Sequence, residues 1–420
     1  MPMLCRYALL TTLALALPCR AEWSVTPAGA VTLDGSALPA ATFAEMSGIG
    51  HFSGSRYYVV QDSGAQVIGI DVTFAAGSLT QAQAAEVYPL SSSLDYEGIA
   101  AGLSEPLLFV SEEGGPGVLE INRDTGQQVR SLTIPAVFAN RRGNRGFESL
   151  DRVGDVLWTA NEEALTVDGP VATTSAGSTV RLLKLDAVSG EPLAQYAYNV
   201  EPIHTSGFSS QSGLSDLLIA PDGRLITLER SFAGLANPAY LSRIYEVDLT
   251  GATDISQAAF DSGLIGQTYT PASKRLLWSG SIGAAGQNLE GLALGPQAAD
   301  GSWDLLGVVD DGAGGDPYSG NTVVGFRLAP STPQVEGDYN GDGQVDTADY
   351  DTWRRAYGLS YTAGQGADGN GDGVVNAADY AVWRDALTAT ESAAHGQAPE
   401  PTAAVLALMV TGVGLMKPRS

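Results

Sequence analysis

The chain has 420 residues, with 22 Lys and Arg against 47 Asp and Glu, which gives a formal net charge of −25. We expect no nucleic-acid partner, because such binding requires clustered cations. The 44% of hydrophobic residues, 16% of charged residues and 51 glycines indicate a folded, turn-rich chain rather than a disordered chain or a helical bundle. Only Lys184, Lys274 and Lys417 are lysines, so an anion site is expected to use arginine or a bound metal.

Residues 1–21 resemble a secretory signal peptide, with Arg6 before a short apolar run and Ala21 at a small-residue cleavage site. A buried helix and a lipoprotein signal ending at Cys19 are the alternatives. Both cysteines of the chain, Cys5 and Cys19, lie in this segment, so the processed protein would contain no disulfide. We therefore expect an exported protein in which metal ions are the cross-links.

Residues 22–328 contain a repeated two-part pattern: a Gly or Ser beside an apolar residue, then a β-rich run that ends in acidic residues. Five copies are centred on positions about 50, 51, 68 and 74 residues apart, namely Ser47, Glu97, Glu148, Asp216 and Glu290. Strand-rich repeats without cores of their own must stack, and closing them into a ring protects their edges. The pattern predicts an all-β propeller with four strands in each blade. We expect six blades, with five as the alternative.

Several motifs of this region occur in an order that is similar to a known family. They include Asp62-Ser-Gly64, Glu97-Gly-Ile-Ala100, Asn144-Arg-Gly-Phe-Glu-Ser-Leu150, Thr159-Ala-Asn-Glu-Glu163, Gly213-Leu-Ser-Asp216, Leu228-Glu-Arg230 and Asn288-Leu-Glu-Gly-Leu292. Over roughly residues 40–328 the chain resembles the phytase-like (esterase-like activity of phytase) domain. The resemblance implies a hydrolase with a small carboxylic ester or phosphoester as its substrate.

Acidic residues gather at the starts and ends of the expected strands. If the first strand of each blade lines the channel, a first set of acids surrounds the axis, and we predict catalytic roles for Glu97, Glu148, Asp216 and Glu290. A second set at neighbouring strand ends is predicted to bind Ca²⁺: Asp62, Glu112, Glu113, Glu162, Glu163, Glu229, Asp310 and Asp311. Clustered Ca²⁺ could hold a phosphate and polarise it for attack by water, as in β-propeller phytases. The alternative is that these acids cap turns.

Arginines near the expected acids are candidates for binding the anion, with Arg145 and Arg230 predicted in the site and Arg141 and Arg142 close to it. Other nucleophilic chemistry has less support, because no Gly-x-Ser-x-Gly motif occurs and the domain contains only His51 and His204. A non-catalytic propeller that binds a surface glycan or protein is the leading alternative function. A lactonase-like calcium propeller is the third.

Residues 329–335 are expected to form a short linker that contains Pro330 and Pro333. Two acidic loops thirty residues apart follow in residues 336–387. Each has oxygen side chains at loop positions 1, 3, 5, 9 and 12 and a Gly at position 6, which is the ligand spacing of an EF-hand. The predicted Ca²⁺ ligands are Asp338, Asn340, Asp342, Gln344, Asp346, Asp349, Asp368, Asn370, Asp372, Val374, Asn376 and Asp379. Gln344 and Val374 contribute their carbonyls.

Both loops end in Asp rather than Glu, run into similar helices and lack a full entering helix. In these features the region resembles a type I dockerin, which implies a small α-helical module with two Ca²⁺ ions and a cohesin partner. The aromatic residues of the two helices, Tyr350, Trp353, Tyr380 and Trp383, could contact that partner or pack the module on itself.

Residues 388–398 are expected to be a second linker. Residues 399–420 then combine Pro399-Glu-Pro401, an apolar run and a basic end, which resembles the PEP-CTERM sorting signal. The resemblance implies processing by an exosortase and a location in the cell envelope, at the cell surface or outside the cell. A simple hydrophobic tail anchor is the alternative.

Overall fold

The computed structural model describes residues 22–38, 43–62, 64–234, 240–282, 287–310, 321–331, 336–340, 343–359 and 366–395. The chain divides into one unit from Trp23 to Pro330 and another that comprises Met1–Glu22 and Ser331–Ser420. The expected signal peptide and the expected sorting signal lie outside the described residues. Over the described ranges, no helix has the length and apolar character needed to cross a membrane.

The larger unit contains five antiparallel sheets of four strands each. The first blade has β2 (Met46–Ser53), β3 (Arg56–Gln61), β4 (Gln66–Ala75) and β5 (Ser78–Pro89). The second has β6 (Tyr96–Ala101), β7 (Leu107–Glu112), β8 (Gly117–Asn122) and β9 (Gln127–Ser131). The third has β10 (Asp151–Val153), β11 (Val156–Ala160), β12 (Ser178–Asp186) and β13 (Pro192–Val200).

The fourth blade has β14 (Phe208–Ile219), β15 (Leu225–Gly234), β16 (Tyr240–Asp248) and β17 (Ser273–Gly280). The fifth has β18 (Asn288–Gln297), β19 (Trp303–Asp310), β20 (Thr322–Ser331) and β1 (Glu22–Thr32). Two short 3₁₀ helices, Ala136–Asn140 and Ala258–Phe260, lie outside the sheets. The strand β1 pairs with β20, so the N-terminal strand completes the last blade and closes the ring.

Tight turns with left-handed residues reverse the chain within the blades. Ala76 and Gly77, with φ of 50° and 79°, form the two-residue link between β4 and β5. Consecutive positive φ values are typical of the hairpin turns whose twist matches that of the flanking strands. The sequence between such turns is rich in β-branched and aromatic residues, as in Tyr57-Tyr-Val-Val60 of β3, which favours strands.

The expected all-β propeller is confirmed, but the expectation of six blades is wrong, because the ring has five. Over the described residues, the long spacings between the last repeats contain no additional sheet. They contain long connections, residues 161–177 between β11 and β12 and residues 249–272 between β16 and β17. In addition, residues 22–32 add the outer strand of the fifth blade instead of starting a blade of their own.

Hydrophobic packing between blades holds the ring together. The five large clusters of buried apolar side chains each join neighbouring sheets. Between the first and second blades, for example, Val60 and Val67 pack with Ile99 and Val110. Burial of these side chains removes apolar surface from water, which stabilises the fold by roughly 1.5–3 kcal/mol for each large side chain. No blade could bury both faces alone.

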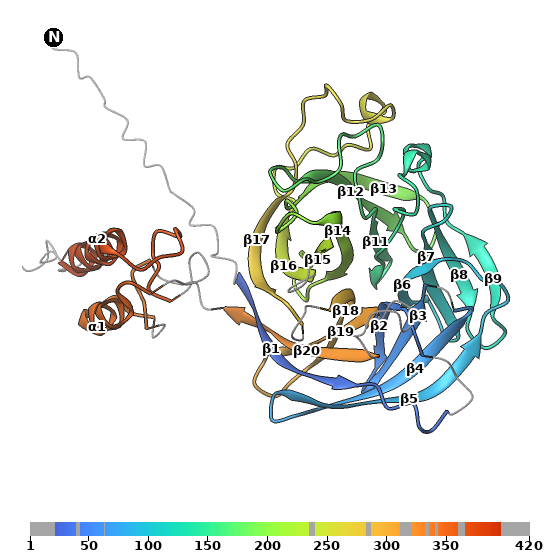
Figure 1. The fold of residues 1–420 in the computed structure, drawn as a ribbon, viewed down its shortest axis with the longest axis horizontal. Coiled ribbons are helices and arrows are strands. Elements are labelled where there is room, and N and C mark those ends of the chain that lie inside the picture. The colour runs from blue at the N-terminus through green and yellow to red at the C-terminus, as the bar shows by residue number, and fades with distance from the viewer. Residues whose placement is uncertain are drawn as a thin grey trace, which may run out of the picture. The chain divides into compact units, whose positions relative to one another are not determined.

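The first strands of the blades contact one another in sequence, from β2 to β6, β10, β14, β18 and back to β2. Figure 1 shows the sheets around a common centre, with β2, β6 and β14 near it and β5, β9 and β13 toward the outside. The repeated Gly or Ser motifs are therefore at the axis. At Gly48, an added Cβ would lie 2.1 Å from the carbonyl oxygen of Glu97 in the next blade, so these strands approach too closely for a side chain.

A buried ion pair fixes the two long connections to the third blade. The Arg181 guanidinium donates to both carboxylate oxygens of Asp168, at 2.7 and 2.8 Å. Asp168 also accepts a hydrogen bond from the Leu264 N–H at 3.0 Å, and Arg181 donates to the Phe260 carbonyl at 3.1 Å. Arg181 is fully buried and Asp168 is 6% exposed. Each charge is therefore stable in the interior only because the other neutralises it.

The smaller unit contains the helices α1 (Thr347–Ala356) and α2 (Ala377–His395). The expected second linker thus begins inside α2. Tyr350, Trp353, Tyr380 and Trp383 pack together, with ring centroids 5.2–6.0 Å apart. The Trp353 indole N–H donates to the Asn376 carbonyl, and that of Trp383 donates to the Asp346 carbonyl. These aromatic residues therefore pack the module on itself, since each helix reaches the opposite loop.

Replacement of Asp168 by Asn should destabilise the propeller. The substitution leaves the Arg181 charge buried without its counter-charge, so we expect the free energy of unfolding to fall by about 3–5 kcal/mol in urea denaturation. The control is Asp124→Asn, because the Asp124 side chain is 55% exposed in its pair with Arg123. We expect a change below about 1 kcal/mol there. Equal losses for the two variants would contradict the structural role of the buried pair.

Candidate functional site

A cavity of about 220 Å³ lies at the centre of the propeller and is lined by residues of four blades and by the segment that precedes the third blade. The residues come from first strands, from second strands or the positions just after them, from the start of β16 and from residues 144–148 before β10. These positions meet because adjacent strands are antiparallel and the first strands surround the axis. The lining residues are Ser47, Asp62, Glu97, Glu113, Asn144, Arg145, Glu148, Gln211, Arg230, Tyr240, Asn288, Glu290 and Asp310.

One acidic cluster joins the first two blades. The nearest carboxylate oxygens of Asp62, Asp95 and Glu97 lie within 4.8 Å of one another. Ser47 donates a hydrogen bond to the Glu97 carboxylate. Within the described part of the chain, the buried Oδ1 atom of Asp95 has no hydrogen-bond partner. The cluster therefore offers several oxygen donors to one small volume.

A second acidic cluster comprises Glu113, Glu148 and Glu162, whose nearest carboxylate oxygens also lie within 4.8 Å of one another. All three residues are buried. Glu162 pairs with two arginines, with Arg145 Nη1 at 2.7 Å from its Oε2 and with Arg230 Nη2 at its Oε1. The carboxylates of Glu113 and Glu148 are consequently the members of this cluster that face the cavity.

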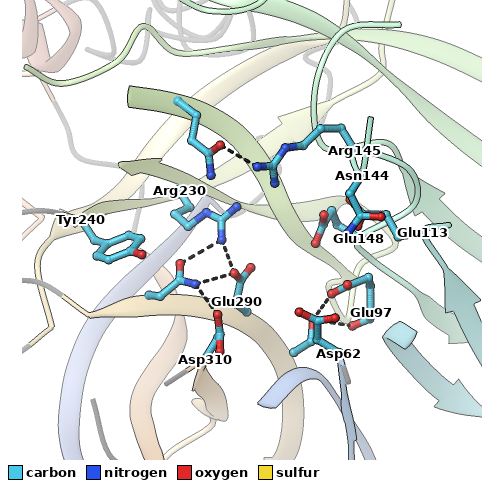
Figure 2. Close-up of a pocket in the computed structure, with 13 residues that line it drawn as sticks. Asp62, Glu97, Glu113, Asn144, Arg145, Glu148, Arg230, Tyr240, Glu290 and Asp310 are labelled. Carbon is cyan, nitrogen blue, oxygen red and sulfur yellow. Dashed lines mark hydrogen bonds and ion pairs between the residues drawn. The ribbon is translucent and has the colours of Figure 1, made fainter. Parts of the chain in front are cut away.

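Arg230 connects the second cluster, through Glu162, to the fifth blade. Figure 2 shows its bonds on the side of the fifth blade. Its Nη1 donates to Glu290 and, at 2.9 Å, to the side-chain oxygen of Asn288. The Asn288 amide then donates to Glu290 at 2.7 Å and to Asp310 at 2.9 Å. The Oε2 atom of Glu290 is buried and, over the described residues, makes no hydrogen bond.

Burial and crowding shift the pKa values of these carboxyl groups upward. The pKa of Asp62 rises to about 8, chiefly through its hydrogen bond with Asp95 and through burial. Burial raises the pKa of Glu113 to about 7, with repulsion from Glu162 and Asp95 adding to the shift. Burial also raises the pKa of Glu290 to about 7, although Arg230 opposes the shift. The pKa values of Glu97 and Glu148 rise well above their usual range for the same reasons.

The donor set of the cavity fits a hard cation. Its lining offers carboxylate, hydroxyl and amide oxygens, and no His, Cys or Lys is found among the described lining residues. Calcium prefers oxygen ligands of this kind. A divalent ion would also offset the repulsion that now raises the carboxyl pKa values. Asp62, Asp95 and Glu97 are suited to hold one ion, and Glu113 with Glu148 another.

Nine of the predicted propeller residues belong to this region. Eight line the cavity, namely Asp62, Glu97, Glu113, Arg145, Glu148, Arg230, Glu290 and Asp310. The ninth, Glu162, does not line the cavity but forms ion pairs with Arg145 and Arg230. Glu163 is not among the lining residues, and Asp311 lies outside the described residues.

Three other predicted acids cap backbone or side-chain donors elsewhere. Asp216 is buried and accepts hydrogen bonds from the N–H groups of Leu217 and Leu292. Glu229 accepts hydrogen bonds from the Tyr198 hydroxyl, the Glu201 N–H and Lys274. Glu112 accepts the Gly115 N–H on both oxygens at 2.9 Å. For these three acids the hydrogen bonds agree with the alternative role given in the sequence analysis, which was to cap turns and backbone donors.

Arg141 and Arg142 bond to backbone carbonyls: Arg141 to Gly114, and Arg142 to Ala164 and Gly169. They therefore stabilise loops and do not reach the cavity.

Sequence reasoning missed several lining or neighbouring residues. Asp95 and Asn288 each stand two positions before a predicted glutamate, Glu97 and Glu290. Because alternate residues of a strand share a face, this spacing could have identified them. Gln211 and Tyr240 carry no such signal, since the fold alone brings these residues to the cavity.

The two loops of the smaller unit have matching hydrogen bonds. Asp338 accepts from the Gly343 N–H, and Asp368 from the Gly373 N–H, both at 2.8 Å. Gly343 and Gly373 both have φ of 84°, which a side chain would disfavour. At loop position 5, Asp372 of the second loop accepts a hydrogen bond from the Val374 N–H at 2.9 Å. Its counterpart in the first loop, Asp342, lies outside the described residues.

Loop position 12 is occupied by buried carboxylates in both copies. Asp349 accepts from the N–H groups of Tyr339, Asn340 and Asp346. Asp379 accepts from those of Asn370 and Asn376. Asp346 and Asn376, at position 9, cap the N-termini of α1 and α2 through the N–H groups two residues later. Each loop is thus wrapped around its own acidic residues, in the manner expected of a calcium loop.

The metal-free propeller should lose stability as the pH rises. Asp62, Glu113 and Glu290 have folded-state pKa values of about 7 to 8, above those of the unfolded chain. Between pH about 4 and 8 the folded state therefore binds more protons than the unfolded state, and stability falls across this window. Calorimetry in EDTA should show the melting temperature of the propeller decreasing from pH 5 to pH 8. Glu113→Gln should make the decrease smaller. A melting temperature that rises with pH would contradict the raised pKa values of these buried carboxyl groups.

Comparisons with known proteins agree with this architecture. A family model described as esterase-like activity of phytase (phytase-like) matches residues 41–313. A model of the dockerin type I domain matches residues 336–388. No curated protein matches the chain.

Several solved structures are similar to the chain, each at 12% identity. They are the hydrazine synthase of Kuenenia stuttgartiensis (63% of this chain and 65% of that chain, TM-score 0.33), a luciferin-regenerating enzyme (72% and 95%, 0.36) and the aldose sugar dehydrogenase of Streptomyces coelicolor (74% and 99%, 0.36). The chain thus spans slightly less than two thirds of the hydrazine synthase chain. Likeness at this level carries no argument about function. The family model, by contrast, covers well over half of the chain, and we conclude that the protein belongs to the phytase-like (esterase-like activity of phytase) family and carries a type I dockerin domain.

Proposed function

We propose that this protein is an exported, calcium-dependent hydrolase of phosphoric or carboxylic esters, displayed through its dockerin. The observation that carries the proposal is the central cavity, where buried carboxylates from several blades meet the guanidinium groups of Arg145 and Arg230. Perturbed carboxyl groups beside fixed cations in one cavity are typical of catalytic sites. Membership of the phytase-like family supports the choice of ester hydrolysis.

The residues divide into distinct roles. Asp62, Asp95 and Glu97, together with Glu113 and Glu148, would hold Ca²⁺. Bound calcium would supply a Lewis acid that polarises the ester and lowers the pKa of water. Arg145 and Arg230 are held by Glu162, so their remaining N–H donors can orient an anionic oxygen of the substrate.

Glu290 is suited to act as a general base. Glu290 lines the cavity, its buried Oε2 atom has no hydrogen-bond partner among the described residues, and burial raises its pKa to about 7. A carboxyl group with such a pKa can accept a proton from an attacking water near neutral pH. Asn288 and Arg230 hold its other oxygen, which fixes the direction of Oε2.

The dockerin supports the proposed display and location. A type I dockerin implies calcium binding and a cohesin partner, and such domains are typical of extracellular or cell-surface proteins. We propose two Ca²⁺ ions, one in each loop. Export by the N-terminal segment, and processing of residues 399–420 by an exosortase, complete the proposal, and both segments lie outside the described residues.

Hydrolysis of p-nitrophenyl phosphate or p-nitrophenyl acetate by the full chain tests the activity. We expect a rate that EDTA removes, calcium restores, and Glu97→Gln or Glu148→Gln lowers by at least about a hundredfold. The control is Glu112→Gln, since Glu112 caps a turn next to the cavity-lining Glu113. This variant should keep the wild-type rate. If calcium-loaded protein hydrolyses neither ester nor phytate, a propeller that binds a glycan or protein is the better description.

Calcium removal should unfold the dockerin module before the propeller. The loops place buried carboxylates together, and folding of such modules is coupled to metal binding. In EDTA, limited proteolysis with mass spectrometry should show new cleavages within residues 336–388. Asp349→Asn should give the same cleavages in calcium, whereas Asp351→Asn should not, because Asp351 is exposed on α1 outside the loop. Unchanged protection in EDTA would contradict calcium-dependent folding of this module.

A further inference from the structure

One face of the fourth blade continues from the cavity to the surface. On this face Arg230 of β15 is opposite Gly213 and Ser242, and Phe232 is opposite Gln211 and Tyr240. Gly234 is opposite Phe208 in the next pair outward. Arg230, Phe232 and Gly234 alternate along β15, so they lie on the same face.

The inner part of this face belongs to the cavity. Arg230, Gln211 and Tyr240 all line it. Figure 2 shows the Tyr240 ring at one side of the cavity, with its hydroxyl group directed toward Arg230 and Glu290. The face therefore changes from charged to aromatic as it leaves the cavity.

Aromatic rings cover the outer part. Phe232 and Tyr240 are neighbours, with ring centroids 4.8 Å apart and an interplanar angle of 41°. The Phe208 ring lies over Gly234, since its Cδ2 atom is 3.1 Å from where a Cβ of Gly234 would stand. Phe208 is nevertheless 76% exposed, whereas Phe109, Phe147 and Phe326 are fully buried in the cores between blades. We call Phe208, Phe232 and Tyr240 the aromatic wall.

The dimensions of the cavity indicate what the aromatic wall contacts. A volume of about 220 Å³ is below the roughly 300–1,000 Å³ typical of sites that enclose a whole small molecule. The cavity lining is also almost entirely polar. An ester or phosphate group fits this environment, but an apolar substituent on it does not. The substituent would therefore leave the cavity along a face where ring surfaces are available.

We propose that the aromatic wall is a subsite for the aromatic ring of an aryl ester or aryl phosphoester whose ester group occupies the cavity. This inference rests on the proposed function and narrows its substrate class. Ring contacts of the offset-stacked or edge-to-face kind add about 0.5–1.5 kcal/mol beyond simple burial. That amount corresponds to a preference of about fivefold for an aryl over a small alkyl substituent.

Binding of two phosphonates, which the protein cannot hydrolyse as esters, tests the subsite without turnover. Calorimetry on the full chain with calcium should give a dissociation constant for phenylphosphonate about fivefold below that for methylphosphonate. Phe208→Ala should remove the difference, and Phe208→Trp should keep it. Ile265→Ala is the matched control, because Ile265 is 66% exposed in the connection between β16 and β17 and should leave both constants unchanged. Equal affinities of the wild type for the two phosphonates, or binding of neither, would overturn the proposal that the aromatic wall is a substrate subsite.

Turnover separates this inference from the proposed function. The ratio of kcat/KM for phenyl phosphate to that for methyl phosphate includes the better leaving ability of phenoxide, so the test is how this ratio depends on Phe208. Phe208→Ala should reduce the ratio about fivefold, mainly through KM. Hydrolysis with a phenyl-to-methyl ratio that Phe208→Ala leaves unchanged would support the proposed function and overturn the subsite. Phosphonate selectivity that depends on Phe208, without hydrolysis of any ester, would support the subsite in a binding protein and refute the hydrolase.

Discussion

The packing of each blade against its neighbours is the interaction on which the rest of the structure depends. A four-stranded sheet has two apolar faces here, and clusters such as that of Val60, Val67, Ile99 and Val110 bury them only between blades. The ring must therefore close. The strand β1 closes it by pairing with β20, although the two strands lie at opposite ends of the domain's sequence. Loss of that strand would expose the edge of the fifth blade as well as part of a core.

Closure of the ring also creates the chemistry at its centre. The first strands converge, so carboxylates that are far apart in sequence become neighbours around one small cavity. Buried like charges disfavour ionisation, which is why the pKa values of Glu97, Glu148 and Glu290 rise. The propeller core is thus strong enough to impose an arrangement that the carboxylates alone would not adopt. A bound cation or a substrate held by the arginines would relieve this cost.

The two units illustrate different degrees of predictability. In the dockerin, ligand spacing is local, and the helices and loops fall where the repeated pattern places them. In the propeller, the repeats predicted the blades, but their number followed from long connections and from the strand β1, which no local pattern distinguishes. The site shows the same limit. Glu112 and Glu113 are adjacent, yet one caps Gly115 and the other faces the cavity, because successive side chains at the end of a strand point in different directions.

The sequence by itself determined the strand-rich repeats, the acidic residues at their ends and the two EF-hand-like acidic loops, since each depends on composition or spacing along a short segment. Tertiary structure alone decided that there are five blades, that Asp216 and Glu229 cap donors away from the cavity, and that Gln211 and Tyr240 line the same cavity as Arg230 and Glu290. The reason is physical: a side chain's direction and neighbours depend on which sheets pack together, and that packing joins residues separated by up to the full length of the domain.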